Sequence, residues 1–130
     1  MHGELLKVRC QGCGDIREGT GDLGTGDVCA DCGDQGGLRP HVVWFGEMPL
    51  EMERIFEALD RCRLFMSIGT SGNVYPAAGF VAHVTGGGRT HTVELNMEPS
   101  EGATQFAEAH YGPATELVPA YVDKILNGGW

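Results

Sequence analysis

The sequence predicts an α/β fold in which a parallel sheet is joined to a small four-cysteine zinc-binding module. Two Cys-x2-Cys pairs lie near the start of the chain with fifteen residues between them. Downstream, short apolar runs alternate with helix-like segments across short loops, which is typical of parallel sheets with crossover connections. A chain of 130 residues is long enough for one domain, or for one domain with a small module.

The cysteine pairs predict a structural metal site. Its four ligands are Cys10, Cys13, Cys29 and Cys32. Four thiolates suit tetrahedral zinc and leave no open position for a substrate. Gly14 and Gly33 follow the pairs directly, and glycine allows the positive φ that closes each turn. Two disulfides or free thiols are the alternatives. The glycine-rich segment between the pairs cannot build its own core, so the metal is expected to hold it.

Composition excludes several classes of protein. The net charge of −9 argues against a nucleic-acid partner, and suits either simple solubility or binding of lysine-bearing peptides. No apolar run approaches the roughly 18 residues of a membrane span. Residues 1–4 lack the pattern of a signal peptide, so we expect a cytoplasmic protein with reduced thiols. The fifth cysteine, Cys62, is expected to be a core thiol.

Apolar periodicity predicts the elements in order. They are a strand at 41–46, a helix opened by Pro49 and reaching Cys62, a strand at 64–68, a helix opened by Pro76 and stopped at 86–88, a strand at 91–95, a weak strand at 106–111 and a helix at 115–126. In parallel sheets, ligands bind beyond the carboxyl ends of the strands. We therefore expect residues 46–47, 69–71 and 96–98 to line one edge together.

The loops at these strand ends have ligand-binding chemistry. Gly69, Thr70 and Ser71 can offer backbone N–H groups and hydroxyls to a phosphate or ribose. Asn96 and Glu98 can hold ribose hydroxyls. The alternative in both cases is an ordinary turn at a strand end, because such turns need glycine anyway.

Several motifs together resemble one protein family. They are His2-Gly3, the two cysteine pairs, Arg39-Pro-His-Val-Val-Trp-Phe-Gly-Glu47, Gly69-Thr-Ser71 with Val74 and Pro76, Asn96-Met-Glu98 and Gly112-Pro-Ala114. The chain resembles the C-terminal half of a sirtuin, an NAD-dependent protein-lysine deacylase, in its bacterial, desuccinylase-like form. The resemblance implies a partial Rossmann-like sheet. Residues 1–38 would be the zinc module with a catalytic-type histidine at its start, and 39–130 the C-terminal half of the NAD-binding domain.

The resemblance also implies residue roles. His2, which by itself would be taken as an exposed terminal histidine, would be the general base that activates the nicotinamide ribose. The segment that pairs with an acyl-lysine peptide would be Val43, Trp44, Phe45, Gly46 and Glu47. Contacts to NAD would come from Gly69, Thr70, Ser71, Asn96, Met97, Glu98 and Ala114. Zinc would be structural, and NAD a co-substrate.

Two alternatives to an active deacylase (deacetylase or desuccinylase) follow from the same resemblance. The family's N-terminal half, with its pyrophosphate turn and acyl-selecting residues, has no counterpart in this sequence. We therefore expect the isolated chain to bind NAD poorly or not at all, and a truncated, inactive zinc-binding fragment or binding module is the second hypothesis. A third is self-association through an exposed sheet edge, which a second copy would cover.

Overall fold

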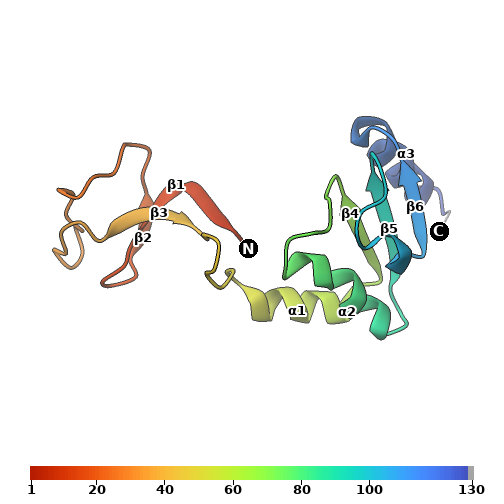
Figure 1. Ribbon diagram of the computed structural model, residues 1–130, viewed down its shortest axis with the longest axis horizontal. Coiled ribbons are helices and arrows are strands. Elements are labelled where there is room, and N and C mark those ends of the chain that lie inside the picture. The colour runs from red at the N-terminus through yellow and green to blue at the C-terminus, as the bar shows by residue number, and fades with distance from the viewer. Residues whose placement is uncertain (129–130) are drawn as a thin grey trace. The chain divides into compact units, whose positions relative to one another are not determined.

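The computed structural model describes residues 1–128, and the chain divides into two compact units, Met1–Met52 and Glu53–Trp130. The first unit is built on strands and the second carries three strands and the packed helices (Figure 1). The family resemblance implied a boundary after residue 38. The functional division into 1–38 and 39–130 stays a prediction, while the compact units divide at 52.

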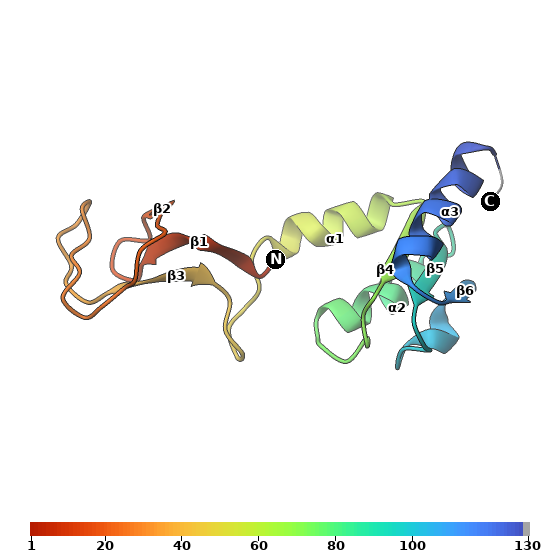
Figure 2. The ribbon, with the colours of Figure 1, turned by 90° about the horizontal axis from the view of Figure 1, so that it is seen from above.

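The first unit holds a three-stranded antiparallel sheet in the order β2-β1-β3. Its strands are β1 (Gly3–Cys10), β2 (Ile16–Glu18) and β3 (Leu38–Val42), and β1 and β3 run alongside each other in Figure 2. The register pairs Gly3 with Val42 and Cys10 with Leu38, with an irregularity between Glu4 and Val8. The buried apolar side chains of this unit are Val8, Cys10 and Cys29, so its core is small.

Two sequence expectations are corrected here. The apolar strand expected at 41–46 is β3, which ends at Val42 and pairs antiparallel with β1 instead of joining the parallel sheet. An apolar run indicates a strand but not its partner, and β1 was not predicted because Leu5 and Leu6 break its alternation. The helix expected from Pro49 is α1 (Met52–Arg61), since residues 50–51 form a turn before it in which Glu51 has a φ of 60°.

The second unit confirms the parallel α/β prediction. Its strands are β4 (Leu64–Ile68), β5 (His91–Asn96) and β6 (Glu108–Tyr111), in the order β4-β5-β6 and all parallel. The helices are α2 (Phe80–Gly86) and α3 (Ala114–Leu126), with short 3₁₀ turns η1 (Ala77–Gly79) and η2 (Ala103–Gln105). These bounds agree with the expected elements to within a few residues.

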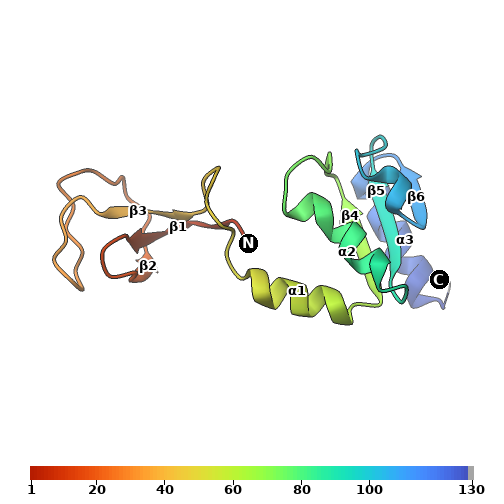
Figure 3. The ribbon, with the colours of Figure 1, turned by 60° about the horizontal axis from the view of Figure 1, so that its bottom comes forward.

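Both faces of the parallel sheet are covered, as such sheets require. Val93 and Leu95 of β5 point to one face and pack with Tyr121 of α3. On the other side, α2 contacts β5 through its buried residues Phe80, Val81 and Val84, and Figure 3 shows the two helices flanking the strands. The partly exposed Cys62 lies 3.8 Å from Thr90 Oγ1 at the margin of this core, so it is less buried than expected.

Among the described residues, no helix has the length and apolar character needed to cross a bilayer. Within the described part of the second unit, β4 pairs only with β5 and is therefore an edge strand.

Candidate functional site

The four predicted cysteine ligands meet in the first unit. Their sulfur atoms all lie within 4.8 Å of one another. The Sγ atoms of Cys10 and Cys32 are 3.7 Å apart, and those of Cys13 and Cys29 are 3.8 Å apart. Tetrahedral zinc with Zn–S bonds of about 2.3 Å places its sulfurs about 3.8 Å apart. No disulfide joins these cysteines. The donor set and its spacing therefore fit a structural zinc ion.

The turns that carry the cysteine sulfurs have the positive-φ glycines that the sequence predicted. Gly14 and Gly33 have φ values of +80° and +77°. The Gly14 N–H donates to the Cys10 carbonyl over 3.0 Å, and the Gly33 N–H to the Cys29 carbonyl over 2.9 Å. Backbone N–H groups of Cys32 and Asp31 lower the pKa of the Cys29 thiol to about 7. Burial and the neighbouring thiols raise the pKa of Cys13 to about 12, so the four thiols do not lose their protons equally readily before a metal binds.

His2 is held beside the end of β3. The Val43 N–H donates to the His2 carbonyl over 2.9 Å, and the neighbouring Gly3 pairs with Val42. Gly3 has a φ of +87°, and a Cβ at this position would overlap the His41 carbonyl oxygen. Glycine at position 3 is therefore required for the close approach. The His2 side chain is exposed, so it is accessible to a ligand.

The segment expected to bind a peptide, residues 43–47, is a closed turn rather than a strand. The Glu47 N–H donates to the Trp44 carbonyl over 3.0 Å, and the Trp44 N–H donates to Glu47 Oε2 over 2.9 Å. Hydrogen bonds from Arg39 first, and from the Trp44 N–H second, lower the pKa of Glu47 to about 2. The first unit thus brings together His2 and the 43–47 turn, which lie about forty positions apart in the sequence.

The two predicted NAD-contacting loops meet in the second unit. Residues 69–71 and 96–98 line one hollow of about 280 Å³, together with Asn73, Pro99 and Glu101. The Gly69 N–H donates to the Leu95 carbonyl over 3.0 Å, which joins the ends of β4 and β5. Carboxyl ends of neighbouring parallel strands therefore form this hollow, as the general rule for such sheets predicts.

Asn96 links the two loops that line this hollow. Its Nδ2 donates to the Thr70 carbonyl over 2.7 Å, and its Oδ1 accepts the Met97 N–H over 3.0 Å. One N–H and one lone pair of the amide remain for a ligand. Ala114, the first residue of α3, is not in the lining of the hollow, although the nearby Gly112 N–H donates to the Asn96 carbonyl over 2.8 Å.

Sequence reasoning missed some of the residues that shape these sites. Arg39 was quoted only as part of a motif, yet it contacts Glu47 and Trp44. Asn73 and Glu101 line the hollow without having been singled out. Their proximity to Gly69 and Glu98 in the sequence is the one signal that could have indicated them.

Known proteins match the chain along nearly its whole length. The model of the Sir2 family matches residues 1–76, which is more than half of the chain. The chain belongs to the Sir2 family. This confirms the resemblance on which the expected fold and site residues rest.

Individual relatives support the assignment of this chain to the Sir2 family. It is 60% identical over 126 residues to a protein of Pasteurella multocida and 57% identical over 128 residues to one of Salmonella typhimurium, both named NAD-dependent protein deacylase. These matches take in 97% and 98% of the chain, but 53% and 46% of the relatives. The chain thus spans about half the length of the curated relatives it matches.

A solved structure extends the likeness to three dimensions. A Sir2 homologue in complex with NAD superposes with a TM-score of 0.82 at 29% identity, over 97% of this chain and 50% of the homologue. This Sir2-family fold, a Rossmann-like parallel sheet with a four-cysteine cluster, is the fold class that the sequence predicted.

Proposed function

We propose that this chain serves NAD-dependent removal of acyl groups from protein lysines, in which the acyl group moves to ADP-ribose and nicotinamide is released. The observation that carries the proposal is the first unit's pairing of His2 with the 43–47 turn. It is supported by a relative, 60% identical over 97% of the chain, that is named NAD-dependent protein deacylase.

In this proposal each unit has its own task. The 43–47 turn binds an acyl-lysine peptide, and the His2 imidazole takes a proton from a ribose hydroxyl of the NAD-derived intermediate. An imidazole suits this step because its ordinary pKa lies near neutral pH. The hollow lined by 69–71 and 96–98 binds NAD through small residues, the Asn96 amide and the Glu98 carboxylate. The zinc ion holds the first unit and takes no part in the reaction.

The test is release of nicotinamide from NAD by the purified chain, with acetyl-lysine and succinyl-lysine peptides as separate substrates. Release that needs both NAD and peptide supports the proposal, and the absence of release from a zinc-loaded chain that binds peptide favours the second candidate below. His2→Ala should abolish release while zinc content stays unchanged. The matched control is His83→Ala, because His83 is an exposed histidine of the second unit that pairs with Asp60. Release that survives in His2→Ala contradicts the role of His2.

A zinc-bearing binding module without turnover is the second candidate. The observation that favours it is that the four-cysteine cluster and the 43–47 turn belong to one compact unit, whereas the hollow lined by 69–71 and 96–98 belongs to the other. Its signature is stoichiometric zinc, with peptide binding but no nicotinamide release.

Self-association and a cytoplasmic location complete the proposal. β4 is an edge strand among the described residues, and a second copy would cover its unpaired backbone groups. Sedimentation at high protein concentration tests self-association, because a chain that stays monomeric there does not self-associate.

The zinc thiolates need a reducing compartment, and the cytoplasm is such a compartment.

A further inference from the structure

Arg39 is a charged residue buried at the base of the 43–47 turn. Its side chain is 8% exposed. The guanidinium donates to both carboxylate oxygens of Glu47, with 3.0 Å from Nη2 to Oε2. Nη2 also donates to the Val42 carbonyl over 2.9 Å, and the guanidinium lies 3.5 Å from the centre of the Trp44 ring. One side chain thus contacts the beginning, the middle and the end of the turn.

The turn closes around this side chain. Glu47 Oε2 accepts a hydrogen bond from the Trp44 N–H, and Gly46 adopts a φ of +88° that completes the bend. As a result, Phe45 is 98% exposed and Trp44 is 53% exposed. Large apolar side chains held in water by an ordered polar scaffold mark a contact surface. The ion pair therefore fixes how the turn presents its backbone and its two rings.

Stability alone does not explain Arg39. Its Nε is buried and has no hydrogen-bond partner among the described residues. The Glu47 side chain is 35% exposed, so water screens the ion pair and limits its contribution to stability, and the buried Nε without an acceptor lowers that contribution further. The planar fork of arginine, by contrast, suits a position that must hold a carboxylate and stack on an indole at once. Arg39 therefore fixes the conformation of the 43–47 turn.

We propose that Arg39 is a positioning residue that holds the 43–47 turn in its peptide-binding conformation. The inference rests on the proposed function, because it assigns Arg39 to the affinity for acyl-lysine peptide. A turn ordered before binding loses less conformational entropy on binding. Arg39→Lys keeps the charge but loses the fork, so peptide binding weakens at least tenfold. Since Arg39 is not expected to touch the reacting atoms, KM for peptide rises and kcat changes less than about twofold.

The experiment titrates a fluorescent acyl-lysine peptide by anisotropy against the full chain and three variants, Arg39→Lys, Glu47→Gln and Lys7→Gln. Lys7 forms an exposed ion pair with Glu4 in the same unit, so Lys7→Gln is the matched control and should bind as the wild type does. Acrylamide quenching of Trp44 fluorescence is measured for the same variants in a Trp130→Phe background, so that Trp44 is the only tryptophan. We expect greater quenching in Arg39→Lys, with zinc content unchanged. Glu47→Gln should be intermediate, because its amide oxygen still accepts the Trp44 N–H.

Each outcome decides the matter. Equal peptide affinity in Arg39→Lys overturns the inference, whether or not quenching of Trp44 increases. Loss of zinc in both Arg39→Lys and Glu47→Gln also overturns it, because Arg39 is then only structural. No peptide binding by the wild-type chain overturns the proposed function itself, and this is seen before any variant is compared.

Discussion

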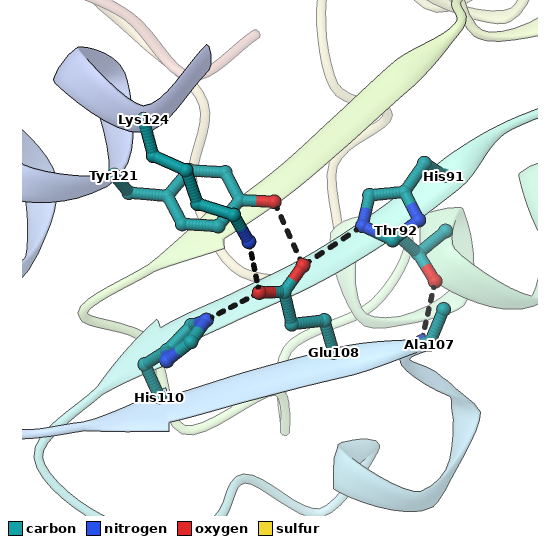
Figure 4. A network of polar contacts seen from close by, with 7 residues as sticks. All are labelled: His91, Thr92, Ala107, Glu108, His110, Tyr121 and Lys124. Carbon is teal, nitrogen blue, oxygen red and sulfur yellow. Dashed lines mark hydrogen bonds and ion pairs between the residues drawn. The ribbon is translucent and has the colours of Figure 1, made fainter. Parts of the chain in front are cut away.

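Lys124 Nζ on α3 donates a hydrogen bond of 2.8 Å to the carboxylate of Glu108 on β6 (Figure 4). The same carboxylate accepts the Tyr121 hydroxyl over 3.0 Å and contacts His91 and His110 over 3.0 Å and 2.7 Å. Both Glu108 and His91 begin their strands, so this network lies at the opposite edge of the sheet from the hollow lined by 69–71. It fastens α3 to the sheet rather than forming part of a binding site.

Removal of this carboxylate should destabilise the second unit. Tyr121 is 4% exposed, and Glu108→Leu would leave its hydroxyl without the acceptor it now has. A buried polar group that loses its partner costs about 1–3 kcal/mol, so we expect the free energy of unfolding to fall by about that amount. Urea denaturation measures the change. Glu116→Gln, an exposed change in the first turn of the same helix, should alter stability by less than about 0.5 kcal/mol.

The same carboxylate should make stability depend on acid pH. Hydrogen bonds from Lys124, then from His91, hold the pKa of Glu108 well below its ordinary value of 4.5. The unfolded chain therefore binds more protons at acid pH, and the stabilisation is complete above pH 4.5 and declines as the pH falls below it. We expect the difference in unfolding free energy between wild type and Glu108→Gln to shrink as the pH falls below 4.5. Urea titrations at each pH measure it, and a difference independent of pH contradicts this assignment.

Metal removal should unfold the first unit selectively. The core of that unit is small and two of its three buried apolar residues are cysteine ligands, Cys10 and Cys29. Structural zinc supplies about 10–16 kcal/mol in small modules. Chelation, or Cys13→Ser, should therefore abolish amide-exchange protection in β1 and β3 but retain it in β4 and β5. Elemental analysis should give one zinc per chain, and Cys62→Ser should keep it. Protection in β1 that survives without metal would contradict the prediction.

Gly3→Ala should disrupt the start of β1. Residue 3 has a φ of +87°, and the added methyl group would overlap the His41 carbonyl oxygen. Left-handed backbone alone costs about 1–2 kcal/mol for an L-residue, and the overlap adds to it. We expect the free energy of unfolding of the first unit to fall by at least about 2 kcal/mol. Amide exchange of the Val43 N–H, which donates to the His2 carbonyl, measures this change. Gly21→Ala is the control, since nothing lies within 4 Å of its added methyl group and its φ is not positive.

Local patterns explain which parts of the fold and of the site were predictable. The strand β4 was predicted because a short apolar run that ends at a glycine indicates a buried strand without knowledge of its partners. The hollow between 69–71 and 96–98 was predictable because parallel strands place their carboxyl ends at one edge. The same rule placed residues 46–47 there wrongly, because β3 pairs with β1 in the first unit. The weak strand β6 was located, but nothing in its sequence indicated that Glu108 would contact four side chains of α3, β5 and β6.

The sequence by itself determined the four-cysteine centre, because cysteine spacing and the glycines after each pair specify the turns and the chemistry within a few residues. It also determined that the strands of the second unit run parallel. Only the tertiary structure decided that β3 pairs with β1, that His2 lies at the 43–47 turn, and that Arg39 holds that turn closed. The reason is physical: these relations depend on backbone pairing and ion pairing between segments distant in the chain, which no local periodicity encodes.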